Sequence, residues 1–134
     1  MDLEIFLESL KKDPSFINRV AYWGIREATD ARYAPVGSNV HPRIKERLRK
    51  MGIDRLYTHQ ADTYRTVSGG KHAVITTPTA SGKSLAYNLP VLDGLLKDPD
   101  AKAVYLFPTK ALSQDQIKGL GDFELDDVRL YVYD

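Results

Sequence analysis

The sequence contains no cysteine and only three histidines, which are scattered along its 134 residues. Disulfide bonds and thiolate metal sites are therefore excluded within this chain, and no histidine cluster indicates a metal centre. The net charge of +1 gives no general attraction to nucleic acid or to a membrane surface. No apolar run is long enough to span a bilayer, and no secretory signal opens the sequence. We therefore expect a soluble, cytoplasmic protein.

The first third of the chain carries one clear periodic segment. Residues 2–12 place apolar side chains on one face and charged side chains on the other, which predicts an amphipathic helix. Asp13-Pro14 is a stop and restart signal, because proline suits the first position of a helix. Residues 15–39 fit neither the helix nor the strand period well, so we expect an irregular segment packed by its aromatic residues.

The rest of the chain alternates short apolar runs with longer helical patterns. This alternation indicates a parallel sheet of the α/β class. The 43% of hydrophobic residues is ample for the core of one such domain. The expected elements are helices at 42–51, 58–68 (with Thr58 as N-cap), 83–97 and 110–120 (with Thr109 as N-cap), and strands at 72–76, 103–107 and 128–133.

Residues 77–84 read Thr-Pro-Thr-Ala-Ser-Gly-Lys-Ser and join a predicted strand to a predicted helix. That context is the one a phosphate-binding loop requires, although Thr77 replaces the first glycine of the usual pattern. The start of the helix offers free N–H groups and a partial positive charge. Lys83 can then reach the outer phosphates of a nucleotide, and the Ser84 hydroxyl can ligate its Mg²⁺. The alternative is a polar helix start that binds nothing, which the flanking strand and helix disfavour.

Three motifs in this order resemble superfamily two helicases. Residues 77–84 resemble motif I, and residues 108–116 (Pro-Thr-Lys-Ala-Leu-Ser-Gln-Asp-Gln) resemble motif Ia. Residues 56–60 (Leu-Tyr-Thr-His-Gln) resemble the glutamine motif upstream of the phosphate loop. Taken together, the residues of the three motifs are most similar to the DEAD/DEAH-box branch that includes mitomycin repair factor A and the RecQ-four-like helicases. The resemblance covers residues 40–134 well and the earlier residues more weakly.

The resemblance implies a fold as well as a family. Residues 41–134 would be the first part of a RecA-like ATP-binding domain, and residues 1–40 a helical and irregular N-terminal extension. Within that extension, Arg26-Glu27-Ala28 and residues 31–34 look like the segment that precedes the family's core. In the family fold, the strands before the phosphate loop and before motif Ia are separated by strands that come later in the chain. We therefore expect unpaired apolar edges or a different pairing, and poor stability in isolation.

The resemblance also implies roles for individual residues. Gln60 would read the adenine edge, because an amide donates and accepts in one plane; the alternative is an exposed helix glutamine. Thr109 and Lys110 would contact the phosphate backbone of a single strand, or would be an ordinary N-cap and a surface lysine. No aromatic stands at the family's adenine-stacking spacing, where Arg43 is a possible substitute. ATP and Mg²⁺ would be held by Thr77, Thr79, Ala80, Ser81, Gly82, Lys83 and Ser84, with Lys83 catalytic and Ser84 on the metal.

Hydrolysis in this family needs an Asp-Glu pair on a later strand and arginines from a second RecA-like domain. Neither occurs before Asp134. We therefore expect the N-terminal part of an ATP-dependent, DNA-translocating and nucleoid-associated helicase. Alone, this part would bind ATP-Mg²⁺ weakly, contact a single strand and hydrolyse nothing. Its partners would be nucleic acid and the remainder of the helicase.

Two other classes of protein fit parts of the sequence. One is a complete small nucleotide-binding module, such as a kinase, but no acceptor site or lid is evident. The other is a nucleic-acid- or partner-binding module with an inactive phosphate loop. That module would use a basic stripe on the helix at 42–51, which is more often a solvated helix face. The stripe consists of Arg43, Lys45, Arg47, Arg49 and Lys50.

Overall fold

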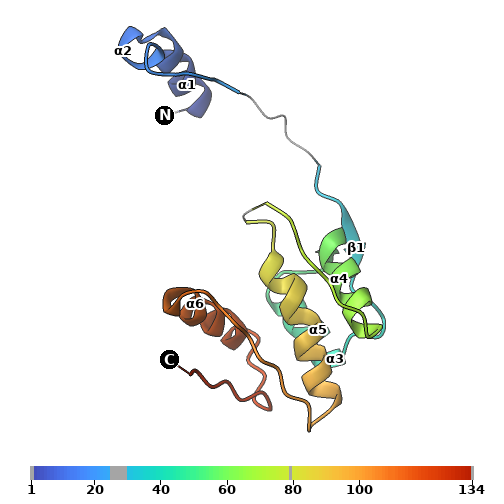
Figure 1. The fold of residues 1–134 in the computed structure, drawn as a ribbon. Helices are drawn as coiled ribbons and strands as arrows, with labels where there is room; N and C mark the ends of the chain where they lie inside the picture. Colours follow the sequence, from blue (N-terminus) through green and yellow to red (C-terminus); the bar gives the residue numbers. More distant parts are fainter. Residues whose placement is uncertain (1, 25–29, 79, 134) are drawn as a thin grey trace. The chain divides into compact units, whose positions relative to one another are not determined.

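The computed structural model describes residues 2–24, 30–78 and 80–133, which fall into two compact units, Met1–Asp30 and Ala31–Asp134 (Figure 1). The first unit contains α1 (Leu3–Lys12), as predicted, and α2 (Pro14–Ile17), which begins at the predicted restart but extends into residues expected to be irregular. Asp13 ends α1 and caps α2, because its carboxylate accepts a hydrogen bond from the Ser15 N–H at 2.8 Å. The ring of Trp23 packs edge-on against Phe16. The predicted pre-core motif Arg26-Glu27-Ala28 lies outside the described residues.

The second unit contains four helices at the predicted places. They are α3 (Pro42–Lys50), α4 (Thr58–Ser68), α5 (Lys83–Lys97) and α6 (Lys110–Gly121). The N-cap of α6 is Thr109, as predicted, whereas that of α4 is Tyr57 and not Thr58. The shift has a local cause, because the Gln60 side chain accepts from the Tyr57 N–H at 2.9 Å and so closes the first turn. Among the described residues, no helix combines the length and the apolar character needed to cross a membrane.

The only sheet in the described part of the chain has two short strands that the sequence did not predict. Strand β1 (Tyr33–Pro35) pairs antiparallel with β2 (Arg55–Tyr57), with Tyr33 opposite Tyr57. This pairing joins a segment predicted to be irregular to the residues directly before α4. It therefore fixes residues that are far apart in the sequence beside the glutamine motif.

The core of the second unit lies between α4 and α5, which pack side by side, with α3 against α5 (Figure 1). Helix α6 and the turn after it complete this core with Leu120, Phe123 and Leu125. Its largest fully buried side chains are apolar or aromatic: Val40, Ile44, Leu48, Leu56, Tyr64, Leu89 and Leu92. The helices thus bury their apolar faces against one another rather than against a sheet.

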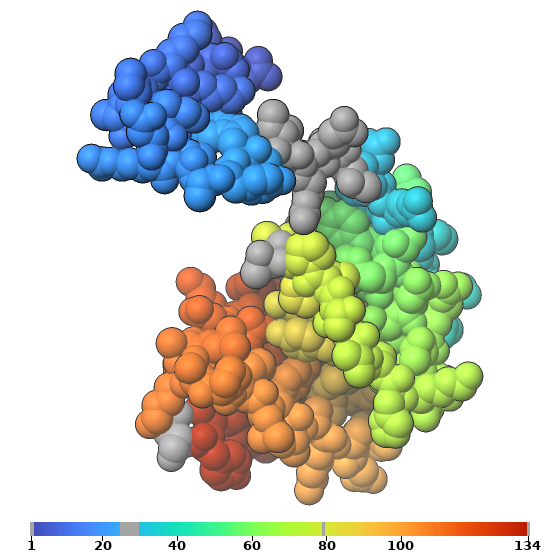
Figure 2. Space-filling model, turned by 45° about the horizontal axis from the view of Figure 1, so that its top comes forward, coloured from blue at the N-terminus to red at the C-terminus, as the bar shows by residue number. Residues whose placement is uncertain are grey.

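The predicted parallel sheet does not form among the described residues. The segments 72–76, 103–107 and 128–133 run without strand pairing. Val74, Val104 and Leu106 are 89%, 84% and 90% exposed, and the two segments that carry them lie on the surface of the second unit (Figure 2). A strand exists only when its N–H and C=O groups meet those of a neighbour. The prediction of strands was therefore wrong for these described segments, whose apolar side chains are exposed without any strand pairing.

One buried carboxylate ties together three parts of the second unit. Asp93 on α5 is 3% exposed and accepts hydrogen bonds from the His41 N–H (2.7 Å), the Tyr64 hydroxyl (2.8 Å) and the Lys97 ammonium (2.6 Å). Lys97 also donates to the carbonyl of Asn39 at 2.7 Å. Burial and the bond to Asp93 raise the pKa of Tyr64, so its hydroxyl stays protonated and keeps donating at neutral pH.

This network predicts an unequal response to the loss of two acidic side chains. Asp93→Ala should lower the free energy of unfolding by about 3 kcal/mol, because one buried donor and two partly buried donors lose their acceptor. Asp62→Ala is the matched control, since Asp62 pairs with Arg65 on the exposed face of α4 and should cost below about 0.5 kcal/mol. Urea unfolding of the chain followed by circular dichroism measures both. Equal losses in the two variants would contradict this role of Asp93.

Candidate nucleotide-binding site

The loop before α5 contains two residues with left-handed backbone conformations. Ala80 and Gly82 both adopt left-handed conformations, with φ values of 59° and 77°. Left-handed residues close together in a turn aim successive N–H groups into a concavity that suits an anion. The hydroxyl oxygens of Thr77 and Ser81 lie 2.6 Å apart, so a side-chain hydrogen bond joins the two ends of the loop. Thr79, a predicted member of the loop, lies outside the described residues.

Lys83 folds back over this loop. Its ammonium donates to the carbonyl oxygens of Thr77 (2.7 Å) and Pro78 (2.5 Å). The positive charge therefore lies against the loop, where its two acceptors among the described residues are neutral carbonyl oxygens. Because hydrogen bonds to phosphate are charge-assisted and stronger, an incoming phosphate would compete well for the ammonium. Ser84, the next residue, is exposed and presents its hydroxyl at the same helix start.

Gln60 connects the glutamine motif to the phosphate loop. Its side chain is 3% exposed, so it is not the solvent-exposed helix glutamine that was the alternative. Its Oε1 accepts from the Tyr57 N–H, and its Nε2 donates to the Gly82 carbonyl, both at 2.9 Å. A carboxamide has two donor hydrogens and two acceptor lone pairs, so one of each remains for a ligand.

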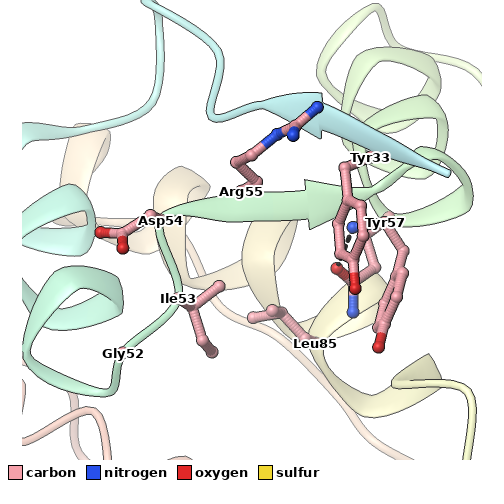
Figure 3. Close-up of a pocket in the computed structure, with 8 residues that line it drawn as sticks. Tyr33, Gly52, Ile53, Asp54, Arg55, Tyr57 and Leu85 are labelled. Atoms are coloured by element: carbon pink, nitrogen blue, oxygen red, sulfur yellow. Dashed lines mark hydrogen bonds between the residues drawn. The ribbon is translucent and has the colours of Figure 1, made fainter. Parts of the chain in front are cut away.

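A cavity of about 360 Å³ opens beside Gln60 (Figure 3). Tyr33 and Tyr57 lie side by side on it, with ring centroids 5.1 Å apart and planes 23° from parallel. The Arg55 guanidinium lies 5.3 Å from the centre of the Tyr33 ring. This aromatic wall was not predicted from the sequence, because the two tyrosines meet only through the β1–β2 pairing. The lining residues are Tyr33, Gly52, Ile53, Asp54, Arg55, Tyr57, Gln60 and Leu85.

The proposed strand-contacting residues stand at the start of α6. The Thr109 hydroxyl oxygen caps the helix by accepting from the Leu112 N–H at 3.3 Å. Thr109 and Lys110 are both exposed. Thr109 is therefore the N-cap of α6, as predicted. The structure places these two residues next to each other at the start of α6.

The basic residues of α3 make contacts within the chain. Arg43 pairs with Asp127, and Arg47 pairs with Glu124 and also donates to its carbonyl at 2.8 Å. Lys45 donates to the carbonyl of Ser38 at 2.7 Å, and Lys50 pairs with Glu46. The contacts of Arg43 and Arg47 fasten α3 to the turn after α6, and all four engagements disfavour a phosphate-binding stripe. Arg43 does not line the cavity beside Gln60, so it is not placed as a substitute for a stacking aromatic.

Comparison with known proteins identifies the family. Residues 57–131, more than half of the chain, match the family described as DEAD/DEAH box helicase. The chain belongs to this family. It is 42% identical over 131 residues to the uncharacterized ATP-dependent helicase YprA of Bacillus subtilis, and 36% identical over 110 residues to the ATP-dependent helicase HRQ1 of Saccharomyces cerevisiae. These alignments cover 96% and 82% of the chain but only 17% and 10% of the relatives, so the chain spans a small part of their length.

Solved structures agree with this family. The crystal structure of helicase MrfA bound to DNA and AMPPNP matches 94% of the chain with a TM-score of 0.83 and 41% identity, and the chain covers 18% of it. The resemblance to the mitomycin repair factor A and RecQ-four-like branch is thereby confirmed. The family and the structural likeness together indicate the RecA-like α/β class. The described part of this chain contains helices and two short strands.

The geometry predicts opposite effects on stability when alanine replaces Gly82, the N-cap of α5, and Gly94, within α5. A Cβ added to Gly82 would lie 2.5 Å from Gln60 Nε2, and the φ of 77° is unfavourable for other residues. Gly82→Ala should therefore destabilise the chain by about 2 kcal/mol. Gly94→Ala is the control, because its Cβ would meet nothing within 4 Å, and it should stabilise the helix by up to about 1 kcal/mol. Thermal unfolding checks both signs, and a stable Gly82→Ala variant would contradict the packing described.

Proposed function

We propose that this chain is the N-terminal ATP-binding part of an ATP-dependent helicase that acts on nucleic acid, with DNA as the favoured substrate. The observation that carries the proposal is the hydrogen bond from Gln60 to the Gly82 carbonyl, because it joins the base-reading motif to the phosphate loop. The DNA-bound MrfA structure and the ATP-dependent helicases among the relatives support it. On this proposal, residues 41–134 are the first part of the ATP-binding domain.

The phosphates and Mg²⁺ would be held at the start of α5. The fit rests on the left-handed backbone at Ala80 and Gly82, on the Lys83 ammonium and on the exposed Ser84 hydroxyl, since hard cations prefer oxygen ligands. Thr77 and Ser81 close the loop and so position these groups. When bound, Mg²⁺ would neutralise charge on the phosphate oxygens.

Adenine would occupy the cavity beside Gln60. The unused donor and acceptor of the Gln60 amide match N7 and the N6 amino group of adenine, so base reading and the bond to Gly82 are compatible. Tyr33 or Tyr57 would provide the stacking face, with Arg55 on the rim. A nucleic-acid strand would meet Thr109 and Lys110, where the N-terminus of α6 favours a phosphate.

Two ligands separate the phosphate and base contributions to binding. Lys83→Ala should weaken binding of both ATP and tripolyphosphate more than about 10-fold, because both need the ammonium. Tyr33→Ala should weaken ATP about 5- to 10-fold and leave tripolyphosphate unchanged, because only ATP stacks. Tyr22→Ala, an 87% exposed tyrosine of the first unit, is the control. Titration calorimetry with Mg²⁺ gives the affinities, and unchanged ATP binding in Lys83→Ala would refute the site.

The chain alone should show no ATP turnover. The family's hydrolytic Asp-Glu pair and second-domain arginines have no counterpart in these residues. Phosphate release with single-stranded DNA present measures this directly. Turnover above background that disappears in Lys83→Ala would overturn the expectation and show that this chain completes a hydrolytic site by itself.

A further inference from the structure

A tyrosine one helical turn after Ser84 links the phosphate loop to α6. The Tyr87 hydroxyl donates to Gln116 Oε1 on α6, and its oxygen lies 3.4 Å from the Ser84 hydroxyl oxygen. Tyr87 and Gln116 are both half-buried. A path of three polar side chains therefore runs from the proposed metal ligand to the helix that begins with Thr109 and Lys110.

The direction of the hydrogens along this path follows from the groups themselves. Gln116 Oε1 can only accept, so the single hydroxyl hydrogen of Tyr87 goes to it. The Tyr87 oxygen then has lone pairs to accept from the Ser84 hydroxyl. A serine that gives a lone pair to a cation must point its hydrogen away from that cation, and cation binding makes its hydroxyl a stronger donor. In this structure the 3.4 Å contact is oriented with Tyr87 as the donor, so the Ser84 side chain would turn and give its hydrogen to Tyr87 only when a cation takes the serine lone pair.

We propose that Tyr87 and Gln116 transmit nucleotide occupancy at Ser84 to α6, so that bound ATP-Mg²⁺ and a bound strand change each other's affinity. The inference rests on the proposed function, because it assumes a nucleotide at Ser84 and a strand at Thr109 and Lys110. A stronger hydrogen bond between Ser84 and Tyr87 would shift the Tyr87 hydroxyl toward Ser84. Because the same hydroxyl is bonded to Gln116, this shift would move Gln116 and with it α6. Such coupling between two sites is necessarily reciprocal and is typically 5- to 150-fold. Tyr87 and Gln116 are positioning residues in this scheme.

The surrounding packing supplies a matched control. The Tyr87 ring meets the Tyr105 ring edge-on at 6.1 Å, and the Tyr105 hydroxyl donates to the buried Asn88 at 3.0 Å. Burial raises the pKa of Tyr105 to about 12, which keeps this hydroxyl a donor at neutral pH. Tyr105→Phe removes a hydroxyl from the same ring cluster without touching Ser84 or α6. This variant therefore shows how far the loss of a tyrosine hydroxyl by itself changes the coupling between the two sites.

The test measures equilibrium binding in the full-length natural protein. Fluorescence anisotropy gives the Kd for labelled single-stranded DNA with and without saturating AMPPNP-Mg²⁺, and the ratio of the two is the coupling factor. Tyr87→Phe and Gln116→Met should each bring this factor to within about twofold of 1, and the double variant should show no further loss, since the two residues act as one unit. Gln116→Glu keeps an acceptor for Tyr87 and should restore most of the coupling. Tyr105→Phe should couple as the unchanged protein does.

The outcomes separate this inference from the proposed function. Failure of the unchanged protein to bind AMPPNP-Mg²⁺ or DNA would refute the proposed function. Binding of both with a coupling factor of 1 would refute the inference alone. Coupling that persists in both Tyr87→Phe and Gln116→Met, or that is lost equally in Tyr105→Phe, would also overturn it.

Discussion

The buried amide of Gln60 joins the first turn of α4 to the first turn of α5, and the geometry of the candidate site depends on that junction. One amide group holds the Tyr57 N–H and the Gly82 carbonyl at the same time. The first contact sets where α4 begins and so orients Tyr57 beside the cavity. The second fixes the left-handed Gly82 from which α5 starts. Because Asp93 ties the same two helices further along, α4 and α5 are held at two separated points.

The helices were predictable because their signals are local. Apolar periodicity, Pro42 at a helix start and Thr109 at an N-cap need only a few neighbouring residues, and each element was found within a residue or so of its predicted bounds. Strands depend on partners that a local pattern does not contain. The apolar runs around Val74 and Val104 have strand composition, yet they remain unpaired in the described chain. The β1–β2 pair had the opposite problem, since its three-residue strands are too short to show a period.

The candidate site divides in the same way. Residues 77–84 form a contiguous motif, so the sequence alone predicted the loop and the roles of Lys83 and Ser84. The aromatic wall of the cavity was not predictable, because Tyr33 and Tyr57 come together only through antiparallel pairing of distant residues. The polar path from Ser84 to Gln116 is likewise a product of how α5 packs against α6. No spacing in the sequence encodes either arrangement.

The phosphate loop holds its shape here without a sheet beneath it. In a RecA-like domain the loop lies between a paired strand and a helix, whereas here the strand side at residues 72–76 has no partner. The loop is instead constrained from the helix side, by the Gly82 carbonyl on Gln60 and by the Lys83 ammonium on the carbonyls of Thr77 and Pro78. Pairing of residues 72–76 with a neighbouring strand would therefore bury Val74. It would also fix the backbone that enters the loop, whose helix end is already constrained. The described part of the candidate loop is thus held at its helix end although residues 72–76 are unpaired.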